Sequence, residues 1–276
     1  MILNFKKEKK YLIAEIGWNF MGKISLAKSM IDAAKKSGAD FVKFQIWNPD
    51  NLETGDWDHD GRRKIYQKAY LNEKRYKQIH NYCKKIKIGC FASIFSETEI
   101  NFYNKINKDL IKIPSHEAYN IKLIDKCLKK FKQVIISAGA LKKRELIRLN
   151  KYKNNKKVLV MHCVSSYPLV AENCNFGKLD YLKKNFKKVG YSGHYSGIED
   201  ALYAINNGAV FIEKHFTTNK SLPGRDNKFA ILPDELKRIK DYIEISYRFE
   251  IQRGLDLQKC EKDIYSYYRG RWAKKN

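Results

Sequence analysis

The stretch Phe41-Val42-Lys43-Phe44-Gln45-Ile46 is an apolar run that carries a polar side chain at two alternate positions. Successive side chains of a β-strand point to opposite faces, so Lys43 and Gln45 share one face and the apolar residues beside them share the other. A strand with an apolar face toward helices and a polar face toward a lumen is typical of a barrel. We therefore expect Lys43 and Gln45 to point into an enclosed lumen.

Short apolar runs of the same kind recur along the whole chain, and helical patterns separate nearly every pair. The other runs cover residues 11–16, 86–92, 110–114, 134–137, 158–163, 189–192 and 210–216. Gly38 and Gly208 precede two of the runs, and each is expected to end a helix in the left-handed conformation. Strand–helix alternation repeated about eight times predicts an α/β protein of the (β/α)₈ TIM-barrel class, with its functional groups at the carboxyl ends of the strands.

The length of 276 residues suits one such barrel and leaves no room for a second sizeable domain. We expect a single domain over 1–276, with 253–276 as a terminal helix and tail. No apolar run approaches the roughly 18 residues that span a bilayer, and residues 1–10 lack the apolar core of a signal peptide. These features predict a cytoplasmic protein without a membrane partner.

The net charge of +25 comes from 55 Lys and Arg residues against 30 Asp and Glu residues. Most lysines precede the apolar runs, where helices end, so they are expected on the face opposite the chemistry and complement the helix dipoles there. A polyanion-binding module that uses this basic face stays open as an alternative. Nucleic acid is not the expected partner, because no basic run interleaved with aromatic residues is present.

Two long connections follow predicted strands, at residues 48–70 and 217–232. Long loops in a compact domain commonly serve as lids or binding loops. Both are expected on the face where the strands end, so both are candidates for covering a site.

Lys43 and Lys112 are both expected inside the lumen, where an unpaired ammonium group is costly. A salt bridge between Lys43 and Glu15 is one solution. The other is an anion cradle for a phosphate or carboxylate, completed by hydroxyl groups at neighbouring strand ends. The hydroxyl groups belong to Ser93, Ser115, Ser137 and Ser192.

His194 and His215 lie at the ends of successive predicted strands, so a barrel would bring their rings close together. Imidazole suits Mn, Fe, Co or Zn, and a carboxylate or a substrate oxygen could complete the coordination shell. Two core histidines with satisfied hydrogen bonds are the alternative. The six cysteines form no C-x-x-C pair and indicate no zinc site.

Seven motifs occur in an order that resembles the sialic acid synthase family, that is, N-acetylneuraminate synthase and its legionaminate and pseudaminate relatives. They are IAEIGWN at 13–19, VKFQ at 42–45, KIPSHE at 112–117, HCVSSYP at 162–168, GYSGH at 190–194, EKHFT at 213–217 and LPGRD at 222–226. The resemblance implies a TIM barrel that condenses phosphoenolpyruvate with an N-acetylated amino-sugar aldehyde, with the help of a divalent metal, usually Mn²⁺. The products would be phosphate and a nine-carbon α-keto acid.

The resemblance also implies a role for each matching residue. Glu15 and Glu117 would handle protons and position the attacking water, while His194 and His215 would hold the metal that polarises the aldehyde. The substrate-binding residues implied are Lys43, Ser93, Lys112, Ser115, Ser137 and Ser192 for phosphoenolpyruvate, Gln45, Tyr167 and Asp226 for the sugar, and Ser165 within the same motif as Tyr167.

The chain departs from the family pattern at several places. Phe20 stands where the family often has histidine, Gly193 stands where it usually has aspartate, and residues 93–96 read Ser-Ile-Phe-Ser instead of Ser/Thr-Pro-Phe-Asp. The family's barrel is followed by a small antifreeze-like domain, and we expect this chain to lack it. That domain normally contributes to sugar binding, to site closure and to the family's dimer, so these three features do not follow from the barrel alone. A homodimer and a separate chain that carries the domain are the two alternatives for a protein partner.

Two further alternatives stay open for the same barrel. It could bind phosphoenolpyruvate without catalysis, as an accessory protein. It could also be another phosphosugar aldolase that uses Lys43 or Lys112 to form a Schiff base.

Overall fold

The computed structural model describes residues 1–4, 9–55 and 61–272, and its unit Met1–Ile243 forms a closed barrel of eight parallel strands. Each strand pairs with the next one in the sequence, and β8 closes the ring against β1. The predicted (β/α)₈ barrel is therefore confirmed. The strands are β1 (Tyr11–Gly17), β2 (Phe41–Ile46), β3 (Gly89–Ile94), β4 (Leu110–Ile113), β5 (Gln133–Ser137), β6 (Val158–Cys163), β7 (Val189–Gly193) and β8 (Phe211–His215).

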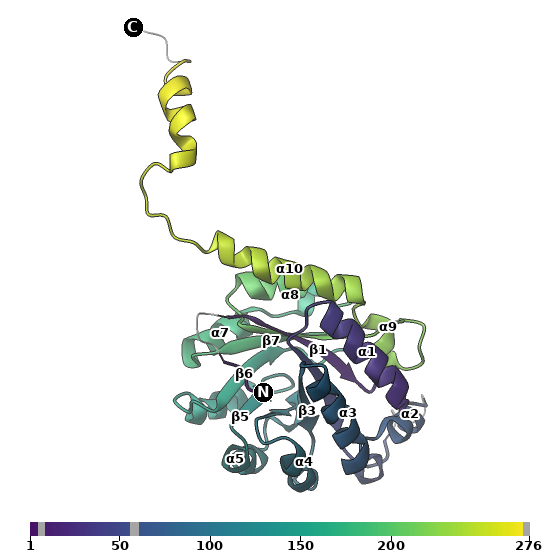
Figure 1. Cartoon of the computed structure of the whole chain (residues 1–276). Coiled ribbons are helices and arrows are strands. Elements are labelled where there is room, and N and C mark those ends of the chain that lie inside the picture. Colours follow the sequence, from purple (N-terminus) through teal and green to yellow (C-terminus); the bar gives the residue numbers. More distant parts are fainter. Residues whose placement is uncertain (5–8, 56–60, 273–276) are drawn as a thin grey trace. The chain divides into compact units, whose positions relative to one another are not determined.

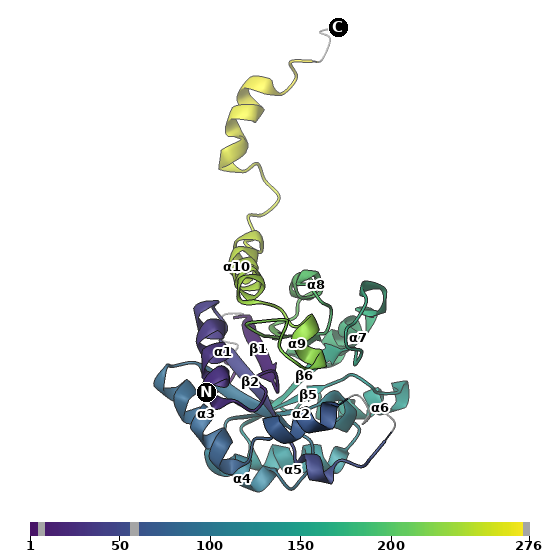
Figure 2. The ribbon, with the colours of Figure 1, turned by 90° about the vertical axis from the view of Figure 1, so that its right-hand side faces the viewer.

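Helices lie around the outside of this ring, as Figure 1 and Figure 2 show. They are α1 (Ile24–Lys36), α2 (Arg62–Ala69), α3 (Glu73–Lys85), α4 (Ile100–Ile106), α5 (Ile121–Lys130), α6 (Lys143–Arg148), α7 (Gly177–Asn185), α8 (Glu199–Asn206), α9 (Arg225–Phe229) and α10 (Pro233–Phe249). Lysines occupy the last turns of α1, α3, α5 and α7, where they complement the helix dipole as expected. Within the described ranges, we find no helix with the length and apolar character needed to span a bilayer.

The lumen is built in layers, because inward-facing residues recur at every second position of each strand. Phe41 and Phe211 begin their strands and are buried in an apolar cluster that fills the lower part of the lumen. Two residues further along the same strands, Lys43 and Glu213 are buried polar groups. The apolar cluster consists of Leu3, Tyr11, Ile13, Phe41, Phe91, Leu110, Ile135, Leu159, Met161 and Phe211.

Gly190 makes room for this lower layer. A Cβ atom at Gly190 would lie 2.3 Å from the ring of Phe211. We expect Gly190→Ala to lower the free energy of unfolding by about 1–3 kcal/mol, because overpacking a barrel core forces side chains from their preferred positions. Urea denaturation measures the change. Gly177→Ala is the matched control, since its nearest neighbour would be 4.0 Å away, and an equal loss in both variants would contradict the packing argument.

The third strand differs from its predicted range of 86–92. Ile86 still caps α3, and Lys87 then adopts the left-handed conformation with φ of 60°. The strand therefore begins only at Gly89 and includes Ser93. The two glycine predictions are confirmed, since φ is 89° at Gly38 and 81° at Gly208.

Both predicted long loops contain helical structure. The connection at 48–70 holds a 3₁₀ turn (Pro49–Asn51) and α2, while its residues 56–60 lie outside the described residues. The connection at 217–232 holds the short helix α9. Each helix brings side chains to the carboxyl ends of the strands, as described below.

The second unit, Glu244–Asn276, contains the end of α10, a 3₁₀ turn (Lys259–Glu261) and a single π-helical turn (Ile264–Tyr268). Tyr267 and Trp272 are among its exposed aromatic residues. A terminal helix and tail were predicted over 253–276, and the structure has these short turns within 253–272. The last four residues lie outside the described part of the chain. The single-domain prediction for 1–276 stays a prediction.

Candidate active site

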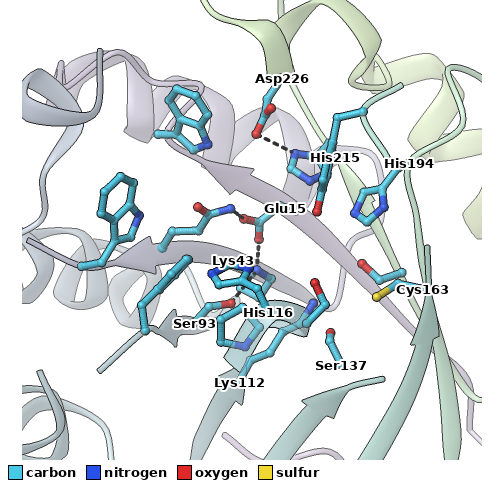
Figure 3. A pocket seen from close by; sticks show the side chains of 18 of the residues that line it. Glu15, Lys43, Ser93, Lys112, His116, Ser137, Cys163, His194, His215 and Asp226 are labelled. Atoms are coloured by element: carbon cyan, nitrogen blue, oxygen red, sulfur yellow. Dashed lines mark hydrogen bonds and ion pairs between the residues drawn. The ribbon is translucent and has the colours of Figure 1, made fainter. Parts of the chain in front are cut away.

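A cavity of about 460 Å³ opens at the carboxyl ends of the strands (Figure 3). Every strand of the barrel contributes to its lining, which is where barrel enzymes carry their chemistry. The strand residues that line it are Glu15, Lys43, Gln45, Ser93, Lys112, Ser137, Cys163, Ser192, Glu213 and His215.

The structure brings together all but two of the side chains that the sequence predicted for the site. Ser165 is outside the lining, but its hydroxyl is 2.7 Å from the hydroxyl of Ser115, which does line the cavity. Glu117 ends the 3₁₀ turn Ser115–Glu117 and is also outside the lining, and burial raises the pKa of its carboxyl group. The predicted roles of all these residues stay predictions.

The floor of the cavity is a buried network of two lysines and two carboxylates. Lys43 forms an ion pair with Glu15 and donates a hydrogen bond of 3.0 Å to the hydroxyl of Ser93. The Nζ of Lys112 lies 2.7 Å from Oε1 of Glu213, and the Nζ of Lys43 lies 3.5 Å from the same oxygen. Both the expected salt bridge to Glu15 and the expected proximity of lysines to serines are therefore present (Figure 3).

Burial and neighbouring charges shift the pKa values of the floor groups in different directions. Burial raises the pKa of Glu15 to about 7, although Lys43 opposes the shift. Burial also lowers the pKa of Lys112, against the pull of Glu213. The two nearby lysines outweigh burial at Glu213 and lower the pKa of that carboxyl group. Glu15 is consequently the floor carboxyl group that exchanges a proton near neutral pH.

The rings of His194 and His215 lie side by side above this floor, with 5.5 Å between their centroids (Figure 3). Nδ1 of His194 is 2.6 Å from the carbonyl oxygen of Val164. A carbonyl oxygen only accepts, so Nδ1 carries the hydrogen and Nε2 keeps its lone pair. Burial lowers the pKa of His194 to about 3, and burial together with neighbouring cations lowers the pKa of His215 as well.

Two features of these histidines are compatible with the predicted metal site, which stays a prediction. Both rings are neutral, which is the form that binds a metal, and Nδ1 of His215 is buried without a hydrogen bond. His162 shows the opposite behaviour, since its Nε2 lies 2.7 Å from the carbonyl oxygen of Cys174 and it does not line the cavity. Over the described ranges, no group of three or more protein ligands is positioned around one point, so a metal would need oxygen ligands from outside the chain.

Asp226 reaches the site from α9, and its Oδ2 lies 3.5 Å from Nδ1 of His215. Burial raises the pKa of Asp226 to about 6, although Arg225 opposes the shift. The guanidinium group of Arg225 lies 5.1 Å above the ring of Tyr167. The predicted residues Asp226 and Tyr167 thus form one wall of the cavity together with Arg225.

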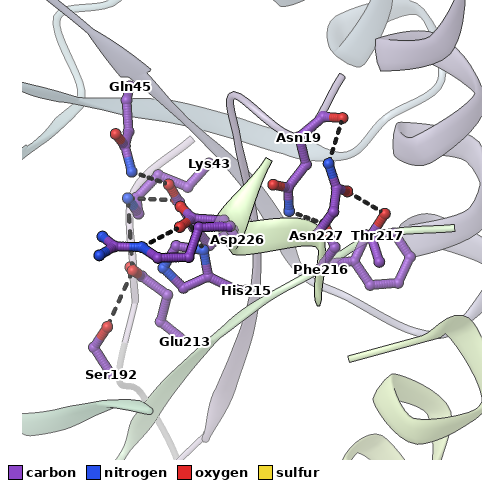
Figure 4. Close-up of polar contacts among 12 residues, drawn as sticks. Asn19, Lys43, Gln45, Ser192, Glu213, His215, Phe216, Thr217, Asp226 and Asn227 are labelled. Atoms are coloured by element: carbon purple, nitrogen blue, oxygen red, sulfur yellow. Dashed lines mark hydrogen bonds and ion pairs between the residues drawn. The ribbon is translucent and has the colours of Figure 1, made fainter. Parts of the chain in front are cut away.

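A buried amide network fixes this loop to the barrel (Figure 4). The side chain of Asn19 donates a 2.9 Å hydrogen bond to the carbonyl oxygen of Phe216. Thr217 donates a 2.6 Å hydrogen bond to Asn227, which in turn donates to the carbonyl oxygen of Asn19 at 3.3 Å. Asn227, the neighbour of Asp226, is therefore tied by hydrogen bonds to the segment that follows β1.

A cluster of aromatic residues that also lines the cavity was missing from the sequence predictions. The ring of Tyr66 lies 4.2 Å from that of Trp18 and 4.6 Å from that of Trp47, and Trp47 lies 5.6 Å from Phe95. Trp18 and Trp47 directly follow β1 and β2, so the strand-end rule could have found them. Tyr66 and the lining residue Arg62 come from α2, and no sequence signal points to them.

A closed parallel barrel with titratable groups converging at its strand ends defines a TIM-barrel enzyme. A family model described as the NeuB family matches residues 30–249. The chain belongs to the NeuB family. Its relatives include proteins named as sialic-type acid synthases, and the chain is an enzyme of this carbon–carbon bond-forming class, as the resemblance implied.

Two relatives and one solved structure illustrate the similarity. The chain is 35% identical over 250 residues to N,N'-diacetyllegionaminic acid synthase of Campylobacter jejuni, a match that covers 84% of this chain and 75% of the relative. It is 32% identical over 256 residues to a pseudaminic acid synthase of Campylobacter jejuni, with coverages of 87% and 75%. The crystal structure of an N-acetylneuraminic acid synthetase from Leptospira borgpetersenii in complex with citrate matches with a TM-score of 0.84 and 29% identity, covering 96% of this chain and 93% of that one.

Proposed function

We propose that this enzyme condenses phosphoenolpyruvate with an N-acetylated amino-sugar aldehyde and releases phosphate. The product would be a nine-carbon α-keto acid of the sialic, legionaminic or pseudaminic type. The observation that carries the proposal is the pair of buried ammonium groups of Lys43 and Lys112 beneath the cavity. Phosphoenolpyruvate carries a carboxylate and a phosphate, and buried cations with neighbouring hydroxyl groups suit both.

The upper part of the cavity suits the sugar. Gln45, Tyr167 and Asp226 would contact it, because they line the cavity and carry groups that hydrogen-bond to hydroxyl and amide groups. His194 and His215 would hold a divalent metal, for which we propose Mn²⁺. When bound, the metal would supply Lewis-acid polarisation of the aldehyde oxygen.

Glu15 is the protein group that we assign to proton handling. Its Oε1 accepts a 3.0 Å hydrogen bond from Gln45, which fixes the carboxyl group at the junction between floor and sugar wall. A pKa of about 7 allows it to give or take a proton at neutral pH. Glu117 remains a candidate for positioning the water, although it lies outside the cavity lining.

The direct test is incubation of the enzyme with Mn²⁺, phosphoenolpyruvate and a panel of sugars. The panel includes N-acetylmannosamine, doubly acetamidated deoxyhexoses and, as controls, mannose and glucose. We expect phosphate release only with acetamido sugars, together with a product mass equal to that of the sugar plus pyruvate. Phosphoenolpyruvate binding by calorimetry without phosphate release from any sugar would favour the non-catalytic alternative.

We expect anion binding to take up a proton through Glu15. At pH 8 this carboxyl group is mostly ionised, because its pKa is about 7. A bound anion adds negative charge and draws Lys43 away, so the pKa of Glu15 rises and affinity strengthens as the pH falls, by at most about tenfold per pH unit. Phosphoenolpyruvate itself is fully ionised at pH 8, since a phosphate monoester has a second pKa near about 6.

Calorimetry at pH 8 in two buffers of different ionisation enthalpy measures this uptake. Glu15→Gln keeps the shape of the side chain and removes its titration, so the buffer dependence should vanish in that variant. Equal proton uptake by wild type and Glu15→Gln would show that another group is responsible.

The proposed partners are phosphoenolpyruvate and the amino sugar. Association as a homodimer, or with a separate chain that carries an antifreeze-like domain, also remains a proposal. Sedimentation of the enzyme alone would separate a monomer from a dimer.

A further inference from the structure

A further buried ion pair, separate from the cavity floor, lies between β8 and α8. Asp200 and Lys214 each expose only 2% of their side chains. Lys214 stands between Glu213 and His215 on β8, and strand alternation turns it away from the cavity. Its Nζ donates to both carboxylate oxygens of Asp200, at 2.9 and 3.0 Å, and to the carbonyl oxygen of Tyr195 at 2.7 Å. These contacts use all three hydrogens of the ammonium group.

The carboxylate of Asp200 connects three parts of the barrel. It accepts a 3.1 Å hydrogen bond from the hydroxyl of Tyr191 on β7 and a 2.8 Å bond from the backbone N–H of Ala201 on α8. Through Lys214 it also reaches β8 and the carbonyl oxygen of Tyr195, the residue that follows His194. The ends of the two strands that present the paired histidines are therefore tied to one carboxylate.

Gly193 explains why this carboxylate fits. It pairs in register with Lys214 across β7 and β8, and a Cβ atom at position 193 would lie 2.1 Å from Oδ2 of Asp200. Asp200 thus occupies the volume that a side chain at position 193 would need. The family pattern usually places an aspartate at this position, as noted above, so a carboxylate is present in this chain but comes from a different element.

We propose that Asp200 is a positioning residue that supplies, from α8, the carboxylate that a strand aspartate would otherwise provide at position 193. It acts through Lys214 and the Tyr195 carbonyl group to hold His194 and His215 in their relative orientation. For its kinetic readout the proposal rests on the proposed function. Its spectroscopic readout is independent of that function.

The proposal can be tested by moving the carboxylate from α8 to position 193 on β7. Asp200→Ala removes it, and the double variant Asp200→Ala/Gly193→Asp restores it from β7. The new side chain would start 2.9 Å from Cε1 of Tyr191 and 3.0 Å from Cδ of Lys214, so the buried ring of Tyr191 and the stem of Lys214 must both shift by a few tenths of an ångström to admit it. Asp125→Ala is the control, because Asp125 pairs with the exposed Lys151, 3.0 Å away, and with Tyr152, far along the chain from either histidine.

We expect Asp200→Ala to lower kcat by about tenfold or more with little change in KM for phosphoenolpyruvate, because the lysine floor is untouched. The double variant should regain at least about threefold in kcat, and Asp125→Ala should match wild type. A purely structural pair would change the unfolding temperature without this rescue of kcat. A folded Asp200→Ala enzyme with unchanged kcat, or a folded double variant with no recovery, would overturn the proposal.

Imidazole ¹⁵N spectra of the enzyme without metal or substrate provide the independent readout. We expect Asp200→Ala to shift the ring-nitrogen signals of both His194 and His215, and the double variant to restore them. Unchanged signals in Asp200→Ala would overturn the proposal even if wild-type enzyme turned over no sugar. If Asp200→Ala does not fold, Asp200→Asn takes its place with the same criteria, since it keeps the shape and removes the charge.

Discussion

Replacing Lys112 by methionine is expected to lower kcat/KM for phosphoenolpyruvate by about 10³-fold. The variant removes a buried cation from the cavity floor and leaves the carboxylate of Glu213, 2.7 Å away, without its main partner. Any anion that enters then meets a carboxylate that only the more distant Lys43 still offsets, where it would have met an ammonium group. Steady-state phosphate release and calorimetry of phosphoenolpyruvate binding measure the two parts of this loss.

Two further variants separate binding from folding. Lys112→Met/Glu213→Gln removes both charges, so it should recover the stability that the single variant loses while anion affinity stays weak. Lys132→Met removes a lysine whose ion pair with Asp109 is exposed, and such surface pairs contribute at most about 1 kcal/mol. Activity of Lys112→Met within about threefold of wild type would refute the anion cradle.

Replacing His194 by alanine is expected to abolish measurable turnover and to weaken Mn²⁺ binding by about 100-fold or more. The ring of His194 is held by the carbonyl oxygen of Val164, so its remaining nitrogen is presented in the form that binds metal. The neighbouring ring of His215 cannot compensate alone, because a single imidazole gives a weak site. Equilibrium dialysis with Mn²⁺ measures the affinity directly.

His162 provides the matched control for this experiment. It is also a buried histidine at a strand end, but its ring bonds to the carbonyl oxygen of Cys174 outside the cavity. We expect His162→Phe to cost about 1–3 kcal/mol of stability and to keep both Mn²⁺ affinity and kcat. A loss of Mn²⁺ affinity in His162→Phe equal to that in His194→Ala would point to general damage instead of a metal site.

Much of the site follows from strand alternation alone. The polar positions of β2 placed Lys43 and Gln45 in the lumen, and the same rule applied to Lys112 on β4. Alternation also separates the histidines, because Cys163 faces the cavity and its neighbour His162 must face the other way. Trp18 and Trp47 directly follow the first and second strands, so extending the rule by one residue past each strand would have included them.

Other features depended on packing that no local pattern contains. Arg62 and Tyr66 belong to a helix inside a predicted loop, so their place at the cavity could not be read from spacing. Alternation puts Lys214 on the outer face of β8, where a buried ammonium group requires a carboxylate. The sequence offers no way to choose Asp200 among the acidic residues, because the choice depends on how α8 packs on the barrel.

The apolar layer beneath the lysines affects the order in which ligands can bind. Phe41, Phe211 and their neighbours seal the lumen from below, so the anion and the sugar share the entrance at the strand ends. The ligand that binds deeper in the cavity must bind first, because a ligand bound nearer the entrance would block its access. For the proposed function we therefore expect compulsory-order kinetics, in which phosphoenolpyruvate binds first and a dead-end complex forms at high sugar concentration.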